Sequence, residues 1–103
     1  MTTESNKPST DNRITYETDG YICLIGLNRA DKRNAFDSHM IKQLSEALTR
    51  YENDENLRCA LIFAHGEHFT AGLDLMELLD KWDKGAFEFN DNEIDPWGIG
   101  GKL

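Results

Sequence analysis

Residues 59–79, with the sequence CALIFAHGEHFTAGLDLMELL, decide the fold. They open with an unbroken apolar run, which is typical of a strand that is buried on both faces. A loop with glycines follows, and Asp74 is a good N-cap for a helix, with Glu77 placed to answer it as in a capping box. Gly72 and Leu73 should then lie at the positively polarised start of that helix, where backbone N–H groups lack intrahelical partners. Such donors suit a developing negative charge on a substrate oxygen, and an ordinary strand-to-helix turn is the simpler alternative.

The chain before this stretch predicts a hairpin that leads into a helix. Residues 13–17 alternate polar and apolar side chains, whereas residues 21–27 are nearly all apolar. Asp19-Gly20 between them is a strong turn signal, so the two strands should pair antiparallel, with the second more buried. The following helix, 38–53, should be capped by Asp37 or Ser38. Its apolar face should consist of Met40, Ile41, Leu44, Ala47, Leu48 and Tyr51.

A strand over 58–64 and a second helix over 75–83 complete the expected unit. Strand, helix and strand in succession form a right-handed crossover, so strand 58–64 should pair parallel with strand 21–27. The sequence therefore predicts the α/β class. We expect the second helix to bury an apolar stripe made of Leu75, Met76, Leu78, Leu79 and Trp82.

Composition limits the function classes. The chain has 103 residues and a formal net charge of −8, which argues against nonspecific binding to nucleic acid or to anionic membranes. No apolar run approaches membrane-spanning length, and the first eleven residues lack the apolar core of a signal peptide. Cys23 and Cys59 are isolated within apolar runs and suggest neither a disulfide framework nor a metal motif. A reduced, cytoplasmic setting fits best.

The chain divides into three expected regions. Residues 1–11 contain nothing to bury and should be a disordered tail. Residues 12–84 should form the α/β core. Residues 85–103 are acidic and rich in glycine, without helical or strand periodicity, and we expect a truncated tail whose aromatic side chains need a surface that the chain does not supply.

Two polar loops are candidates for binding. Residues 28–36 place Arg29, Lys32 and Arg33 close together in an otherwise acidic protein, after a buried strand and before a helix. A solvated loop is one interpretation, and a site for phosphate groups is the other. His65 and His68, with Glu67 and Asp74 nearby, match no zinc spacing, so we expect no metal.

The segments NRADKRNAF (28–36) and FTAGLDL (69–75) together resemble the crotonase, or enoyl-CoA hydratase/isomerase, superfamily. The resemblance covers residues 13–80 and implies the N-terminal part of its ββα spiral: a hairpin, a βαβ crossover and an oxyanion helix. It implies an acyl-CoA thioester as substrate and partner, no cofactor, and a homotrimer or hexamer for the complete protein. It assigns the Leu73 N–H as an oxyanion donor, and as substrate-binding residues Arg29, Lys32, Arg33, Ala35, Ala71, Gly72, Asp74 and Leu75.

The sequence also departs from the family pattern. In the family the second oxyanion donor and the acid/base carboxylates follow in a later glycine-rich unit, which this chain does not contain. We therefore expect an N-terminal fragment of an enoyl-CoA hydratase/isomerase-like enzyme, inactive by itself. The alternative is a small, non-catalytic, acidic α/β protein that binds a CoA-type ligand or a partner chain. Hydratase, isomerase, hydrolase, decarboxylase and dehalogenase reactions are not distinguished.

Overall fold

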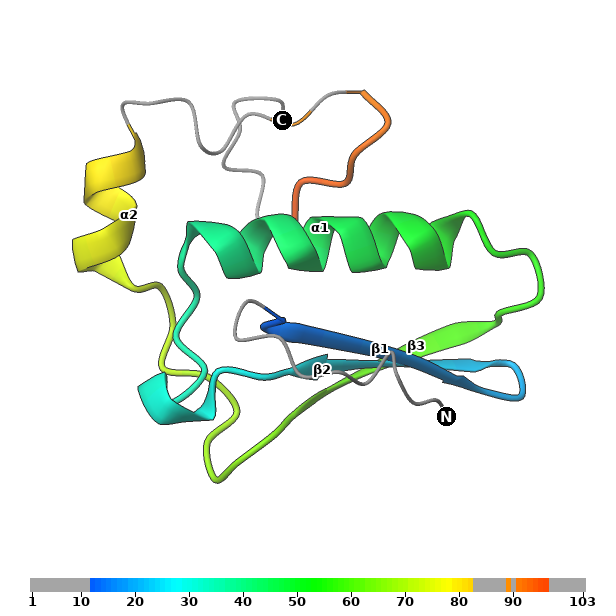
Figure 1. Cartoon of the computed structure of the whole chain (residues 1–103). Helices are drawn as coiled ribbons and strands as arrows, with labels where there is room; N and C mark the ends of the chain where they lie inside the picture. Colours follow the sequence, from blue (N-terminus) through cyan, green and yellow to red (C-terminus); the bar gives the residue numbers. More distant parts are fainter. Residues whose placement is uncertain (1–11, 83–88, 90, 97–103) are drawn as a thin grey trace.

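The computed structural model describes residues 12–82, 89 and 91–96 (Figure 1). The predicted tail at 1–11 and most of the predicted tail at 85–103 lie outside these residues. The described elements, in chain order, are strands β1 (Ile14–Asp19) and β2 (Ile22–Leu27), a 3₁₀ turn η2 (Ala30–Lys32), helix α1 (Ser38–Glu52), strand β3 (Cys59–Ala64) and helix α2 (Leu75–Trp82).

One three-stranded sheet forms the base of the molecule, in the order β1-β2-β3. β1 and β2 pair antiparallel around the turn at Gly20, whose φ of 63° favours glycine. β2 and β3 pair parallel, with Cys23 opposite Ala60, and α1 crosses over one face of the sheet between them (Figure 1). The predicted hairpin, the parallel crossover and the α/β class are confirmed.

The hydrophobic core lies between α1 and the sheet. Ile25 and Leu27 from β2 meet Met40 and Ile41 from α1, and all four are at most 1% exposed. β2 is more buried than β1, and the predicted apolar face of α1 is confirmed, with Leu48 and Tyr51 at its partly buried margin. Asp37 is the N-cap, since its side chain accepts a 2.9 Å hydrogen bond from the Met40 N–H.

The prediction that β3 is buried on both faces is wrong for this chain. Leu61 is 55% exposed and Ile62 is 40% exposed. β3 is an edge strand, and α1 covers a single face of the sheet (Figure 1). No described element covers the other face, so an apolar run that is typical of a central strand remains open to water here.

The apolar stripe of α2 also differs from the prediction. Leu78 is buried at 2% exposure, but Leu75, Met76 and Leu79 are 61%, 85% and 68% exposed. α2 lies beyond the end of the sheet, beside the start of α1, rather than across the sheet (Figure 1). A helix in that position finds a partner surface for Leu78 and leaves Leu75, Met76 and Leu79 accessible.

Residues of the C-terminal part that the structure describes, Phe89 and 91–96, contact α1. Phe89 is 7% exposed and lies beneath the Lys42 ammonium, with Nζ 4.6 Å from the ring centroid. The Ile94 N–H donates to Thr49 Oγ1 at 3.2 Å. The expectation that the aromatic residues of this tail find no surface in the chain is therefore wrong for Phe89, because α1 provides it.

Candidate functional site

The two polar segments of the sequence meet at one end of the sheet. Phe36, at the end of the basic loop (residues 28–36), forms a parallel bridge with Leu73. The Phe36 N–H donates to the Gly72 carbonyl at 2.8 Å, and the Asp74 N–H donates to the Phe36 carbonyl at 2.8 Å. The chain on both sides of Leu73 is thus hydrogen-bonded to a single residue of the basic loop.

This pairing fixes the direction of the Leu73 N–H. The Gly72 carbonyl and the Leu73 N–H belong to one planar trans peptide, so they point in opposite directions. Since the carbonyl is bonded to Phe36, the N–H faces away from the basic loop, and no described residue accepts a hydrogen bond from it. Gly72 has a φ of 95°, a backbone conformation that side chains rarely allow. The Leu73 N–H is therefore an oriented hydrogen-bond donor that has no partner among the described residues.

Asp74 caps the start of α2 as predicted, but the Glu77 side chain does not return a hydrogen bond to Asp74. Asp74 Oδ1 lies 3.4 Å from the Glu77 N–H, and the Asp74 carbonyl accepts from the Leu78 N–H at 2.9 Å. The Glu77 carboxylate instead accepts two 2.9 Å hydrogen bonds from Ser38, one from its N–H and one from its hydroxyl. The N–H groups at the start of α1 also need acceptors, and they lie within reach of Glu77, which explains why the reciprocal half of the capping box is absent.

The Arg29 guanidinium points inward. Its Nη1 donates to the Ala35 carbonyl at 2.8 Å and to Asp74 Oδ2 at 3.1 Å. Its Nη2 lies 3.5 Å from Asp37 Oδ2, a carboxylate that Arg13 also pairs with. The side chain is 13% exposed. Of the three clustered cations, this one is held among carboxylates of the protein.

Asn34 joins the basic loop to the segment after β3, a role that the sequence analysis missed. Its side chain is fully buried, and its Nδ2 donates to the carbonyls of His65 and His68 at 2.9 and 2.8 Å. Its Oδ1 accepts from the Arg29 N–H at 2.7 Å. The backbone of Asn34 has a φ of 57°, a conformation that asparagine adopts more readily than most residues. The only signal for this role in the sequence is the presence of an asparagine in the loop.

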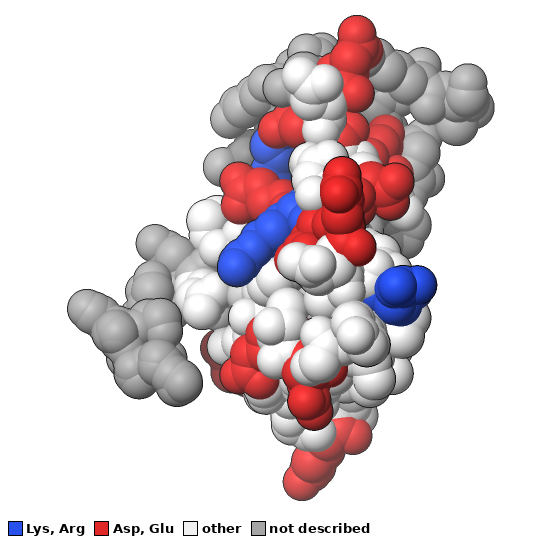
Figure 2. Space-filling model, turned by 90° about the vertical axis from the view of Figure 1, so that its right-hand side faces the viewer, with Lys and Arg blue, Asp and Glu red and all other residues white. Residues whose placement is uncertain are grey.

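Lys32 and Arg33 are exposed and line a groove of about 540 Å³. The groove lies between the basic loop and the turn after β3, which contributes Gly66, Glu67 and His68. His68 and Glu67 were not predicted as ligand-binding residues. Asp31 also lines the groove, so the two cations stand beside two carboxylates, Asp31 and Glu67. The face at the opposite end of the molecule carries many Asp and Glu side chains and few basic ones (Figure 2).

The remaining predicted site residues surround the bridge. The Ala71 N–H donates to the Arg33 carbonyl at 2.9 Å, and Thr70 Oγ1 donates to the Asn34 carbonyl at 2.6 Å. The Ala35 carbonyl accepts from Arg29, and Leu75 is exposed at the first turn of α2. The structure therefore brings the predicted residues of both motifs together, and their roles in ligand binding stay predictions.

His65 belongs to a different polar contact. Its Nε2 lies 3.0 Å from Thr15 Oγ1 on the sheet face opposite α1, directly over Gly26. Within the described ranges, no group of three His, Cys, Asp or Glu side chains is arranged to hold a metal ion. None of the described helices has the length and apolar character that would let it cross a membrane.

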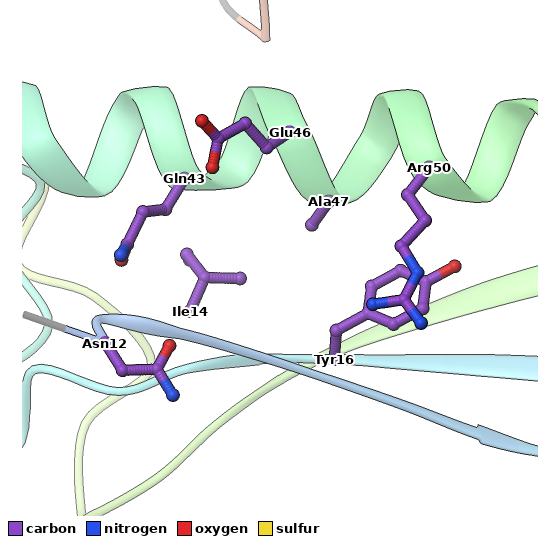
Figure 3. Close-up of a pocket in the computed structure, with 7 residues that line it drawn as sticks. All are labelled: Asn12, Ile14, Tyr16, Gln43, Glu46, Ala47 and Arg50. Atoms are coloured by element: carbon purple, nitrogen blue, oxygen red, sulfur yellow. The ribbon is translucent and has the colours of Figure 1, made fainter. Parts of the chain in front are cut away.

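A smaller cavity, of about 180 Å³, lies between β1 and α1, away from the bridge (Figure 3). The Tyr16 ring forms part of its wall, and the Arg50 guanidinium stacks over that ring at 4.1 Å from the centroid. The phenol oxygen is shielded from water and has no hydrogen-bond partner of normal geometry among the described residues. Burial raises the pKa of Tyr16 to about 12, and the neighbouring Cys23 thiol adds to this shift.

Comparison with known proteins gives consistent matches. The model of the family described as enoyl-CoA hydratase/isomerase matches residues 17–97. The chain is 34% identical over 77 residues to 1,2-epoxyphenylacetyl-CoA isomerase of Escherichia coli K12, covering 75% of this chain and 24% of that protein. It is 32% identical over 72 residues to an enoyl-CoA hydratase of Mycobacterium tuberculosis, covering 70% of this chain and 27% of that protein.

Solved structures agree with these matches. A probable enoyl-CoA hydratase/isomerase from Mycobacterium abscessus aligns over 89% of this chain with a TM-score of 0.75 and 39% identity. An enoyl-CoA hydratase/isomerase from Mycobacterium paratuberculosis aligns over 63% of this chain with a TM-score of 0.61 and 38% identity. The chain spans 35% of the first of these proteins and 24% of the second.

Proposed function

We propose that this chain, which belongs to the enoyl-CoA hydratase/isomerase family of the crotonase superfamily and corresponds to its N-terminal part, binds an acyl-CoA thioester through the Leu73 N–H. The observation that carries the proposal is the Gly72–Leu73 peptide, whose carbonyl is bonded to Phe36 and whose N–H is therefore aimed outward and unpaired among the described residues. A donor that is already oriented needs little reorganisation when negative charge develops on the thioester oxygen. One such donor is commonly worth about 3 kcal/mol of activation free energy.

The CoA phosphates are proposed to bind beside Lys32 and Arg33. Both side chains are exposed at the groove next to His68, and neither forms an ion pair with a described residue. Phosphate oxygens offer such cations charge-assisted hydrogen bonds. Ala71, Gly72, Asp74 and Leu75 would then contact the pantetheine and acyl portion on the way to the Leu73 donor.

For the whole protein we propose enoyl-CoA hydratase or isomerase chemistry, with acyl-CoA as substrate and no further cofactor. A homotrimer or hexamer follows from the family resemblance, and the two free cysteines, Cys23 and Cys59, favour a cytoplasmic setting. The second oxyanion donor and the acid/base carboxylates would come from outside the described residues. The 103-residue chain by itself should therefore not hydrate crotonyl-CoA, because each missing acid/base group is worth about 10²–10⁴ in rate.

The test compares binding of acetoacetyl-CoA with binding of CoA, which has no thioester carbonyl. Calorimetric titration of the chain should show tighter binding of the thioester, and the Leu73 amide resonance should shift with that ligand. Leu73→Pro removes the donor and should abolish the preference, whereas Leu73→Ala keeps the N–H and should preserve it. Equal affinity for both ligands in the unmodified chain would refute the proposed donor.

The phosphate part of the proposal is tested separately. Lys32→Ala combined with Arg33→Ala should weaken both ligands alike and flatten the salt dependence of binding, because fewer charges are screened. The melting temperature should barely move, since exposed cations contribute only about 0–1 kcal/mol to stability. Unchanged CoA affinity at low salt would show that these residues form a solvated loop.

A second candidate is a non-catalytic protein that binds a partner chain. The observation in its favour is the exposed apolar side of α2, with Met76 at 85% exposure beside Leu75 and Leu79. Tight binding of a second protein at α2, combined with no binding of either CoA ligand, would favour this alternative over acyl-CoA binding.

A further inference from the structure

Arg29 differs in kind from the other two cations of the basic loop. Lys32 and Arg33 face the groove, whereas the Arg29 guanidinium is turned under the loop and is 13% exposed. Both of its terminal nitrogens lie within 3.5 Å of a carboxylate of the protein. A ligand phosphate would have to displace those carboxylates before it could bind here.

The two carboxylates that contact Arg29 each start a helix, and each divides its oxygens in the same way. Asp37 accepts from the Met40 N–H through Oδ1 and faces Arg29 through Oδ2. Asp74 faces the Glu77 N–H through Oδ1 and accepts from Arg29 through Oδ2. One guanidinium therefore links the N-termini of α1 and α2.

The same guanidinium also spans the bridge that orients the donor. Its Nη1 donates to the carbonyl of Ala35, immediately before Phe36, and to the carboxylate of Asp74, immediately after Leu73. These two contacts hold together the two segments that pair through Phe36 and Leu73. Any opening of the bridge would rotate the Gly72–Leu73 peptide and misdirect its N–H.

We propose that Arg29 is a positioning residue for the Leu73 donor rather than a ligand for CoA phosphate. The inference rests on the proposed function, in which the Leu73 N–H contacts the thioester oxygen. Arginine is required because its planar fork reaches two carboxylates and a carbonyl at once, whereas the single ammonium of lysine cannot hold all three in this geometry. A positive charge alone would be enough to bind a phosphate ligand, but it would not be enough to hold the two carboxylates and the carbonyl at the same time.

Arg29→Lys is the informative variant, and Arg58→Lys, at an exposed arginine immediately before β3, is the matched control. The affinities for acetoacetyl-CoA and for CoA are measured on each chain. Arg29→Lys should lower the preference for the thioester by about fivefold, the worth of one ordinary hydrogen bond. The Arg58→Lys control should keep the CoA affinity and the melting temperature of the unmodified chain. CoA affinity of Arg29→Lys should also stay unchanged, which a role in phosphate binding would not allow.

Asp74→Asn provides a second variant, because it keeps an oxygen for the α2 cap and removes the charge that Arg29 holds. It should lower the thioester preference in the same way, and it carries the test if Arg29→Lys does not fold. A measurement without substitution completes the experiment: the guanidinium N–H resonances of Arg29 should not shift on addition of CoA. Equal loss of both affinities, an unchanged thioester preference, or a CoA-dependent Arg29 shift would each overturn the positioning role. Absence of any thioester preference in the unmodified chain would instead refute the proposed function.

Discussion

Replacing Asn34 with alanine should release the basic loop from the turn that follows β3. The Asn34 side chain is fully buried and makes three hydrogen bonds, at 2.7, 2.8 and 2.9 Å, to backbone groups of Arg29, His68 and His65. Alanine leaves those partly buried groups without their partner. The loop should then lose the side-chain contacts that hold it against the His65 and His68 carbonyls, while the bond from Thr70 Oγ1 to the carbonyl of residue 34 remains.

The magnitude follows from these contacts and from the backbone. Three hydrogen bonds at about 1 kcal/mol each give about 3 kcal/mol. The φ of 57° adds about 1 kcal/mol for alanine, which tolerates the left-handed region less well than asparagine. A loss of about 4 kcal/mol is a large part of the 5–15 kcal/mol that stabilises a typical domain. Asn34→Gly relieves the backbone strain but not the lost hydrogen bonds, so it should be about 1 kcal/mol less damaging than Asn34→Ala.

Urea unfolding followed by circular dichroism measures these differences in the free energy of unfolding. Asn34→Asp is a useful third variant, since it keeps the acceptor for the Arg29 N–H and places an oxygen against the carbonyls of His65 and His68. It should be at least as destabilising as Asn34→Ala. A loss below about 1 kcal/mol for Asn34→Ala, or equal stability of the alanine and glycine variants, would refute this account of the loop.

Other parts of the structure yield expectations that the same measurements can check. Because the pKa of Tyr16 is raised from 10.0 to about 12, its neutral form stabilises the folded state fully below pH 10, and this contribution should be lost between pH 10 and pH 12. Urea titrations of Tyr16→Phe should lack that decline; its persistence would contradict the assignment. Gly26→Ala would place a Cβ 2.4 Å from Thr15 Oγ1 and 2.7 Å from His65 Nε2, so it should cost about 1–3 kcal/mol and shift the His65 ring resonances. An unchanged stability of Gly26→Ala would contradict this expected steric cost. Glu77→Ala should cost about 0.5–2 kcal/mol because the Ser38 N–H at the start of α1 loses its acceptor, and Glu77→Gln should recover part of it. Equal melting temperatures for these two variants would contradict the contact with Ser38.

The local sequence pattern was sufficient to predict the helices, the strands and the parallel crossover. It was not sufficient to predict which apolar side chains are buried. The spacing of apolar residues in 38–53 specified which side of α1 faces the sheet, because the helical period alone determines that face. The apolar character of Leu61 and Met76 showed that they favour burial, but the pattern carries no information on what covers them. Both are exposed because the described elements place α1 on one face of the sheet and α2 beyond its end.

The candidate site was predicted at the level of its two segments but not of its side-chain contacts. The donor position of Leu73 follows from a loop that ends in a helix cap, which is local information. The direction of Arg29 depends on carboxylates at positions 37 and 74, and the partner of Glu77 is the start of a different helix. Such contacts arise from tertiary placement, so clustering of charges in the sequence could not distinguish an inward arginine from outward ones.

The bridge between Phe36 and Leu73 also bears on how this protein reaches its folded state. All of α1 and β3 lie between these two residues, so the bridge closes a long segment of chain. Ordering such a closure is unfavourable until α1 has packed on the sheet and brought the ends together. We therefore expect the donor to be assembled late in folding. A partly folded chain could show nearly full helical circular dichroism and still bind no thioester, which makes ligand binding a stricter criterion of native structure than secondary-structure content.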